Sequence, residues 1–250
     1  MDPLLTVFTP THVAHSSFHE LPACIESFRE KAIGAANYRH LIVCDSDPAM
    51  GSLIGEYLSL LKSIENKYPE VEVIHRPNSG CRKNYVYTLD AITTPYMFYL
   101  EHDWTFLEEI NLSSLLSVFQ VYPQVNYIRF NHKNNDATSD WDSLHQEASE
   151  IDLLPLLKID CWHNVIHMIR VEDFKTNKLP LVDSWSIEES LTMKYKKTIM
   201  ERGFDEAHKE WGAYLYGKMD SKPVVNNIGV REGENAVGHR VLRLRDAPEI

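Results

Sequence analysis

The apolar positions of the first hundred residues follow two alternating patterns. Short, continuously apolar runs, typical of strands buried on both faces, occupy residues 4–9, 40–44, 71–75 and 96–100. Apolar side chains at intervals of three or four, typical of one helix face, occupy residues 21–31, 53–68 and 81–92. Strands that alternate with helices predict right-handed crossovers and a parallel sheet with helices on both faces. The expected fold class is therefore α/β, with a mixed, mainly parallel sheet.

The second half of the chain has a less regular pattern. Helical spacing occurs at residues 112–121 and 187–201, and runs apolar enough for strands occur at residues 125–130 and 162–170. Ser186 precedes the second of these helices, with Glu189 three positions later, which is the pattern of a capping box. The polar residues 131–150 predict a long loop, and those after Val230 a tail. Because no repeat or linker is visible, we expect a single domain over residues 1–250.

Composition and charge narrow the classes of protein that the chain can belong to. Hydrophobic residues make up 44% and charged residues 24% of the 250 positions, which predicts a folded protein. A net charge of −11 argues against general binding of nucleic-acid backbone, which needs Lys and Arg. The N-terminus lacks the basic region of a signal peptide, and no apolar run approaches the ~20 residues that span a bilayer. We therefore expect a cytoplasmic protein with no membrane span.

The four cysteines give no sign of a disulfide framework or a zinc site. Cys24, Cys44, Cys81 and Cys161 are far apart and form no C-x-x-C pair. Such spacing is typical of reduced thiols in the cytosol.

Polar side chains follow each of the four predicted strands in the first half. In strand order they are Thr9, Pro10, Thr11 and His12, then Asp45, Ser46 and Asp47, then Arg76, Pro77 and Asn78, then Glu101, His102 and Asp103. Ligands of an open parallel sheet bind at the carboxyl ends of its strands, where the strand order reverses. The sequence therefore predicts a binding site at this edge.

Glu101 and Asp103 are the most specific pair in this set. In extended backbone, residues two apart point to the same side, so both carboxylates can address one ligand. Hard oxygen ligands suit Mg²⁺ or Mn²⁺, which usually share their coordination shell with substrate phosphates. The alternative is an ordinary solvated strand end, where acidic residues are common.

Residues 76–84 (RPNSGCRKN) and the following run YMFYLEHD resemble the central signature of family 2-type glycosyltransferases of GT-A fold. That signature has an Asn-x-Gly turn, a basic-Asn element on the next helix, and an apolar strand ending in Asp-x-Asp. Here the first acid is Glu101, and the spacing from Asn78 to Asn84 is shorter than usual. The similarity covers residues 4–110. It implies a Rossmann-like GT-A fold, a nucleotide-diphosphate-sugar donor and a divalent cation, Mn²⁺ or Mg²⁺.

The resemblance also implies roles for the residues at the strand ends. Thr9, Pro10 and Thr11 would border the nucleotide, Asp45 would meet its base, and Arg76, Asn78 and Arg82 would lie near the base, ribose or diphosphate. Asp103 would be the main metal ligand, with Glu101 directed toward the ribose or the metal. Residues 1–110 would then bind the donor, and residues 111–250 would supply the acceptor pocket and the C-terminal tail.

An inverting transfer needs a carboxylate to deprotonate the acceptor hydroxyl, here that of a glycan or glycolipid. The resemblance places this base in an acidic pair at a helix start, which Glu188 and Glu189 match. Capping alone explains Glu189, which favours Glu188, with Asp183 in reserve. A retaining enzyme needs no such base, and the sequence leaves the stereochemistry open.

Three weaker features have competing explanations. His163, Asn164 and His167 fall in the strand predicted over 162–170, where a histidine is more often a core residue than a ligand. Aromatic side chains that can stack on a sugar, but are more often core, are Trp211, Tyr214 and Tyr216. Basic side chains that can close over a diphosphate, but fit a solvated tail better, are His239, Arg240, Arg243 and Arg245.

Two other functions remain open. A nucleotidyltransferase uses a similar sheet, but it carries a Gly-rich loop after the first strand, and here no glycine precedes Gly34. A non-catalytic nucleotide- or sugar-binding module of the same fold would keep the site without turnover. The chain lacks both the G-x-S-x-G elbow of hydrolases and the P-loop of kinases.

Overall fold

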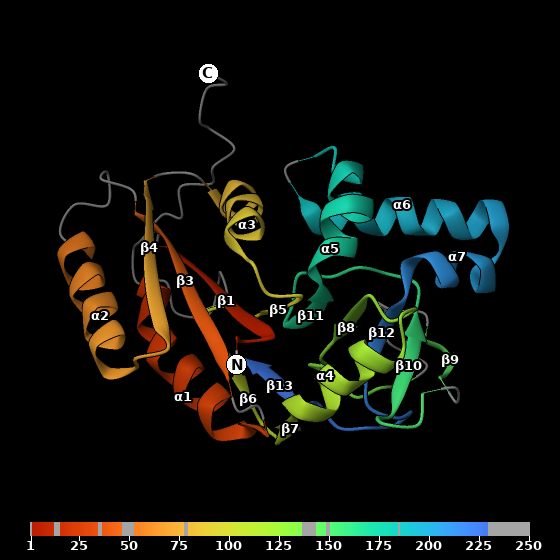
Figure 1. The fold of residues 1–250 in the computed structure, drawn as a ribbon, viewed down its shortest axis with the longest axis horizontal. Coiled ribbons are helices and arrows are strands. Elements are labelled where there is room, and N and C mark those ends of the chain that lie inside the picture. The colour runs from red at the N-terminus through yellow and green to blue at the C-terminus, as the bar shows by residue number, and fades with distance from the viewer. Residues whose placement is uncertain are drawn as a thin grey trace.

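The computed structural model describes residues 2–12, 16–34, 37–46, 53–77, 80–136, 144–148, 151–184 and 186–229. Within this part of the chain, the largest sheet has nine strands in the order β4-β3-β1-β5-β11-β8-β12-β10-β9 (Figure 1). Their bounds are Leu5–His12 (β1), Tyr38–Ser46 (β3), Val71–Pro77 (β4), Tyr96–Tyr99 (β5), Tyr127–Arg129 (β8), Leu144–Glu147 (β9), Leu156–Ile159 (β10), His167–Arg170 (β11) and Ala213–Tyr216 (β12).

Strand directions confirm the expected mixed, mainly parallel α/β sheet. The first-half strands β4, β3, β1 and β5 are mutually parallel, and only β11 and β10 run against the rest. From β1 the chain moves outward through β3 to β4 and then returns to place β5 on the other side of β1. The strand order therefore reverses between β1 and β5, which is where a doubly wound sheet binds its ligand.

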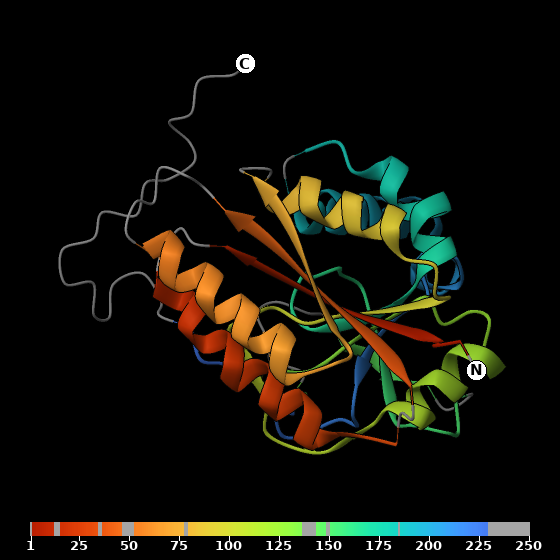
Figure 2. The same ribbon diagram turned by 60° about the vertical axis from the view of Figure 1, so that its left-hand side comes forward.

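This reversal places helices on both faces of the sheet. Helices α1 (Leu21–Lys31) and α2 (Leu53–Lys67) lie side by side on one face, and α3 (Gly80–Ala91) lies on the other (Figure 2). The alternation along β3 serves both layers: Ile42 packs with α1 and α2, whereas Leu41 packs with α3. A strand buried on both faces must be apolar throughout, which explains its continuous apolar run.

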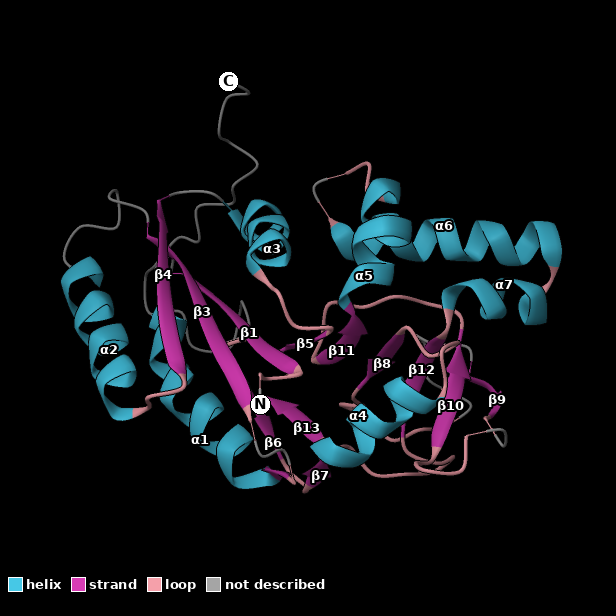
Figure 3. Ribbon diagram, viewed as in Figure 1, coloured by secondary structure: helices cyan, strands magenta, loops and turns pink. Residues whose placement is uncertain are grey.

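The second half repeats this layering with more irregular elements. Helix α4 (Leu112–Val121) covers the same side of the sheet as α1, and both contribute to one apolar cluster. The opposite side is covered by α5 (Val171–Asp173), a π turn η3 (Phe174–Lys178), a 3-10 turn η4 (Leu179–Leu181), α6 (Ile187–Arg202) and α7 (Phe204–Trp211) (Figure 3). None of the described helices is long and apolar enough to cross a bilayer.

Two small sheets join distant parts of the chain. Strand β6 (Trp104–Phe106) pairs antiparallel with β13 (Val225–Asn227), and β2 (Ala32–Ile33) pairs with β7 (Ile110–Asn111). The first pairing brings the last described residues against the segment that follows β5.

The structure corrects several predicted boundaries. The strand predicted over residues 4–9 continues through Pro10 to His12, because β5 pairs with β1 only as far as Phe8 and Pro10 then has one strand neighbour. The predicted loop over 131–150 contains β9, and the strand predicted over 162–170 begins only at His167. The short elements β10, α7, β12 and β13, and the 3-10 turn η1 (Ser16–Glu20) before α1, were not predicted from the sequence.

Candidate functional site

Parallel register aligns polar residues across the carboxyl ends of β1, β3 and β4. His12 on β1 lies opposite Asp45 on β3, which in turn lies opposite Arg76 on β4. On the other side of β1, the Leu100 amide donates to the Phe8 carbonyl at 2.9 Å, so the chain after β5 runs along the same edge. The His12 and His102 rings meet edge to face, 5.3 Å apart. The strand ends therefore form one continuous polar edge.

Glu101 and Asp103 lie on this edge, and protein donors hold both. The Tyr99 hydroxyl donates to Glu101 Oε1 at 3.1 Å. Asn227 Nδ2 donates to Asp103 Oδ2 at 3.2 Å, and the Ile228 amide donates to the Asp103 carbonyl at 2.8 Å. Tyr99 of β5 therefore holds Glu101, and Asn227 of β13 holds Asp103.

Gly229 is in close contact with the Asp103 carboxylate. A Cβ added at Gly229 would lie 2.3 Å from Asp103 Oδ2, well inside any permitted contact. The close approach of backbone to this carboxylate therefore requires glycine, which links the last described residue to the site.

The electrostatics of the acidic pair fit a divalent cation. Burial, and after it the charge of Asp103, raise the pKa of Glu101 to about 8. A cation between the two carboxylates would remove this repulsion. Among the described residues no three His, Cys, Asp or Glu side chains are grouped to hold a metal. Two carboxylates completed by substrate phosphates is the usual arrangement for Mg²⁺ or Mn²⁺, so these residues fit such an ion.

Glu188, in the first turn of α6, reaches the same edge from the second half of the chain. Its Oε1 lies 2.7 Å from His163 Nδ1, and its Oε2 accepts the Asn164 amide at 3.1 Å. Because β11 runs antiparallel to β5 with His167 opposite Tyr99, residues just before β11 lie beside those just after β5. The charge of Glu188 accordingly contributes to the raised pKa of Glu101.

Burial alone would raise the pKa of Glu188, but other contacts outweigh it. The hydrogen bonds from His163 and Asn164, together with the charge of Arg129, hold this pKa below its usual value. Glu188 is therefore ionised at neutral pH, which is the state that a general base needs.

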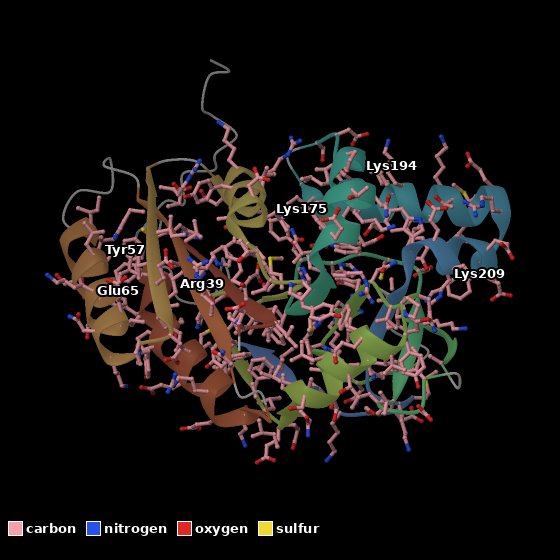
Figure 4. All side chains as sticks on the ribbon, in the orientation of Figure 1. Arg39, Tyr57, Glu65, Lys175, Lys194 and Lys209 are labelled. Carbon is pink, nitrogen blue, oxygen red and sulfur yellow. The ribbon has the colours of Figure 1, made fainter. Side chains whose placement is uncertain are left out.

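The other two candidate bases are placed differently. Ser186 Oγ caps α6 by accepting a hydrogen bond from the Glu189 amide at 3.1 Å. In a full capping box the glutamate side chain would accept the Ser186 amide, but here that amide donates to Ser184 Oγ. The Glu189 side chain is exposed. Asp183 is also exposed and pairs at 2.8 Å with Lys194, labelled in Figure 4. Of the three, Glu188 is the one that the structure brings to the acidic edge.

The residues predicted to border the nucleotide, Thr9, Pro10 and Thr11, all lie within β1. Thr9 is buried, and its hydroxyl lies 2.8 Å from His40 Nε2 inside the sheet. Thr11 is buried beside Tyr57 of α2, and Pro10 lies between them in β1. Because β1 extends three residues beyond Thr9, the side chain at its end is that of His12.

The predicted cationic residues flank the edge. The Arg76 guanidinium stacks on Tyr87 of α3 at 4.0 Å. Arg82 Nη2 donates to the Val182 carbonyl at 3.2 Å, which ties α3 to the segment before α6. Asn78 lies outside the described residues, as does the basic run His239, Arg240, Arg243 and Arg245.

Burial shows which of the weaker histidine and aromatic candidates belong to the core. His167 is a core residue, as the more common interpretation predicts, because it bonds to Tyr85 and to the Val165 carbonyl and stacks on Tyr99. Trp211 and Tyr214 are buried, and Tyr216 packs on Phe130. His163 is the exception, because it precedes the strand and contacts Glu188.

Two residues in contact with Asp103, Asn227 and Gly229, were not among the residues that the sequence predicted for the site. His163 and Asn164 were only weaker candidates. The one local sign of Asn227 and Gly229 in the sequence is that a short polar segment follows the apolar pair at residues 224–225. His163 and Asn164 adjoin the predicted strand, but nothing local indicates their distant partner.

Comparisons with known proteins identify the architecture. The sequence profile of glycosyl transferase family 2 matches residues 6–178. The fold is similar to S. aureus TarS 1-349 with UDP (TM-score 0.53, 12% identity, 90% of this chain and 60% of that chain) and with UDP-GlcNAc (0.52, 16%, 94% and 60%). It is also similar to the mannosyltransferase PcManGT from Pyrobaculum calidifontis with GDP-Man and Mn²⁺ (0.53, 12%, 93% and 59%).

These matches confirm the expected GT-A fold. At such low identity, the likeness to solved structures concerns the fold alone. The chain spans 60% or less of each of these proteins. No match was found among curated proteins.

Proposed function

We propose that this chain, which belongs to glycosyl transferase family 2, transfers a hexose from a nucleotide-diphosphate donor to a hydroxyl group of a glycan or glycolipid acceptor. One observation carries the proposal: the segment after β5 that contains Glu101 and Asp103 runs beside the segment before β11, which holds Glu188 through His163 and Asn164. The first half then binds the donor and the second half the acceptor.

The proposed reaction is a single displacement that inverts the anomeric carbon. Glu188 takes the proton of the acceptor hydroxyl while that oxygen attacks the anomeric carbon and the nucleoside diphosphate departs. His163 and the Asn164 amide hold the carboxylate during this step. His12, Asp45 and Arg76 line the edge that would receive the nucleotide.

Asp103, with Glu101 beside it, would hold a divalent cation, Mn²⁺ or Mg²⁺. When bound, such an ion would neutralise charge on the departing diphosphate. The structures of distant relatives suggest the donors to test first, because TarS forms complexes with UDP and UDP-GlcNAc, and PcManGT with GDP-Man and Mn²⁺.

The donor is tested by thermal shift with UDP-GlcNAc and GDP-mannose, each with and without MnCl₂. A ligand at a hundred times its Kd stabilises the folded state by about 2.7 kcal/mol, so a true donor raises Tm clearly. Asp103→Asn should abolish the manganese-dependent part, whereas Asp90→Asn, on the exposed side of α3, should not. An unchanged manganese response in Asp103→Asn contradicts the metal role.

The base is tested by release of nucleoside diphosphate from the donor so identified. Glu188→Gln should lower turnover roughly 10²–10⁴-fold with little change in Tm, because it removes a general base. The matched control is Glu189→Gln, on the next position of the same helix, which should retain turnover. Normal turnover in Glu188→Gln contradicts the assignment, and donor binding without any release in the wild type favours a non-catalytic module.

A further inference from the structure

We infer that His163 is a positioning residue for the reaction: its Nδ1–H group orients the Glu188 carboxylate toward the acceptor hydroxyl. The inference rests on the proposed role of Glu188 as the base. It assigns a function to a side chain that the sequence places in a core strand and that the structure places at the carboxyl edge of the sheet.

The contact between the two side chains is short and defined. Nδ1 lies 2.7 Å from Glu188 Oε1. An ionised carboxylate only accepts hydrogen bonds, so the ring hydrogen must lie on Nδ1 and point at the oxygen. The adjacent Asn164 amide donates to the second oxygen at 3.1 Å. Two consecutive residues therefore fix both oxygens and leave each with a second lone pair for the acceptor proton.

The segment that carries His163 is itself held in place. Trp162 exchanges two hydrogen bonds with Thr192 of α6, one through its amide and one through its carbonyl. The Tyr127 hydroxyl of β8 donates to the His163 carbonyl at 2.7 Å. The backbone beside the imidazole is thus bound to α6 through Trp162 and to the sheet through Tyr127, so the ring loses little freedom when the site acts.

Exposure separates the two roles. The His163 side chain is 12% exposed and its Nε2 atom is buried, whereas the Glu188 side chain is 37% exposed. A hydroxyl group can therefore reach the glutamate more readily than the histidine. For this reason His163 positions the base and is not the base itself.

Charged and titratable groups from neighbouring elements also act on Glu188. Arg129 of β8 favours its ionised form. Glu101 after β5 and His167 of β11 both respond to its charge. None of them replaces the donor that His163 supplies to Oε1, so loss of that donor should weaken the ionised form specifically.

The test is the pH profile of nucleoside diphosphate release from UDP-GlcNAc or GDP-mannose, whichever stabilises the protein with MnCl₂. Rates are measured with water as acceptor, so no glycan needs to be known. A base must be ionised, so turnover rises with pH through its pKa. His163→Phe should move this acid limb upward by about one pH unit and lower kcat at neutral pH about tenfold, with KM for the donor unchanged.

Conservative variants separate orientation from structure. Asn places an amide donor at the position of Nδ1, so the acid limb of His163→Asn should lie at the same pH as that of the wild type. Gln places its amide one bond farther out, so the acid limb of His163→Gln should stay shifted. His208→Phe removes a buried, hydrogen-bonded ring from α7 and should lower Tm without moving the limb. If His163→Phe does not fold, the difference in acid limb between His163→Asn and His163→Gln tests the role of His163 alone.

The outcomes of the inference and of the proposed function are distinct. A limb that stays in place in His163→Phe and His163→Gln, or a His163→Asn variant no better than His163→Gln, overturns the role of His163. Loss of turnover in Glu188→Gln would still support the base. Unchanged turnover in Glu188→Gln, or failure of both donors to bind, instead contradicts the proposed function.

Discussion

Acidification should destabilise the fold through His40, a histidine that is buried as a neutral ring in β3. Burial, and after it the nearby charge of Arg29, lower the pKa of His40 from 6.5 to about 3. The ring is 1% exposed, and its Nε2 pairs with the Thr9 hydroxyl at 2.8 Å. Between pH 6.5 and 3 only the unfolded chain binds this proton, so stability is present above pH 6.5 and falls as pH falls.

The size of the effect follows from the two pKa values. Between pH 7 and pH 5, protonation of the unfolded state should lower the free energy of unfolding by about 2 kcal/mol. Other groups change stability in the same range. Burial raises the pKa of Glu101 to about 8, and this group acts in the opposite direction. The total pH dependence is therefore composite, and a variant is needed to isolate His40.

The measurement is urea unfolding of the wild type and His40→Gln at both pH values. Gln cannot titrate and its amide can still meet the Thr9 hydroxyl, so the variant should lose about 2 kcal/mol less than the wild type on acidification. His19→Gln is the matched control, because the His19 side chain is 47% exposed, unlike the buried His40, and the variant should follow the wild type. Equal losses in wild type and His40→Gln would refute the reasoning.

Three further outcomes follow from individual contacts. Gly229→Ala should displace the Asp103 carboxylate and weaken manganese-dependent donor stabilisation, measured by thermal shift, while the Tm without ligand changes little. Ser186→Ala should cost about 0.5–2 kcal/mol in urea unfolding by removing the cap of α6, whereas Ser59→Ala on the exposed side of α2 should cost less. Leu41→Ala should cost about 2–5 kcal/mol, because the side chain is fully buried between β3 and α3; a loss below 1 kcal/mol would contradict that packing.

Local sequence determined the fold of residues 1–110 almost completely. The continuous apolar runs and the helical spacing predicted β1, β3, β4 and β5 and the three helices between them, with errors confined to their ends. Such periodicity is readable because each of these strands and helices buries one or two apolar faces, which repeat at the spacing of its own backbone. The strand ends then indicated Asp45, Arg76, Glu101 and Asp103, since parallel strands deliver their carboxyl ends to one edge.

Tertiary structure decided how that edge is completed. Asn227 lies 124 residues from Asp103, and Glu188 lies 25 residues from His163, yet each pair is in hydrogen-bond contact. Short strands such as β12 and β13 carry too few residues for a periodic signal, and they are stabilised by the sheet that receives them. The sequence therefore determined which carboxylates come to the edge. Only the packing of the second half against the first decided which residues hold them there, because those contacts join segments that have no local interaction.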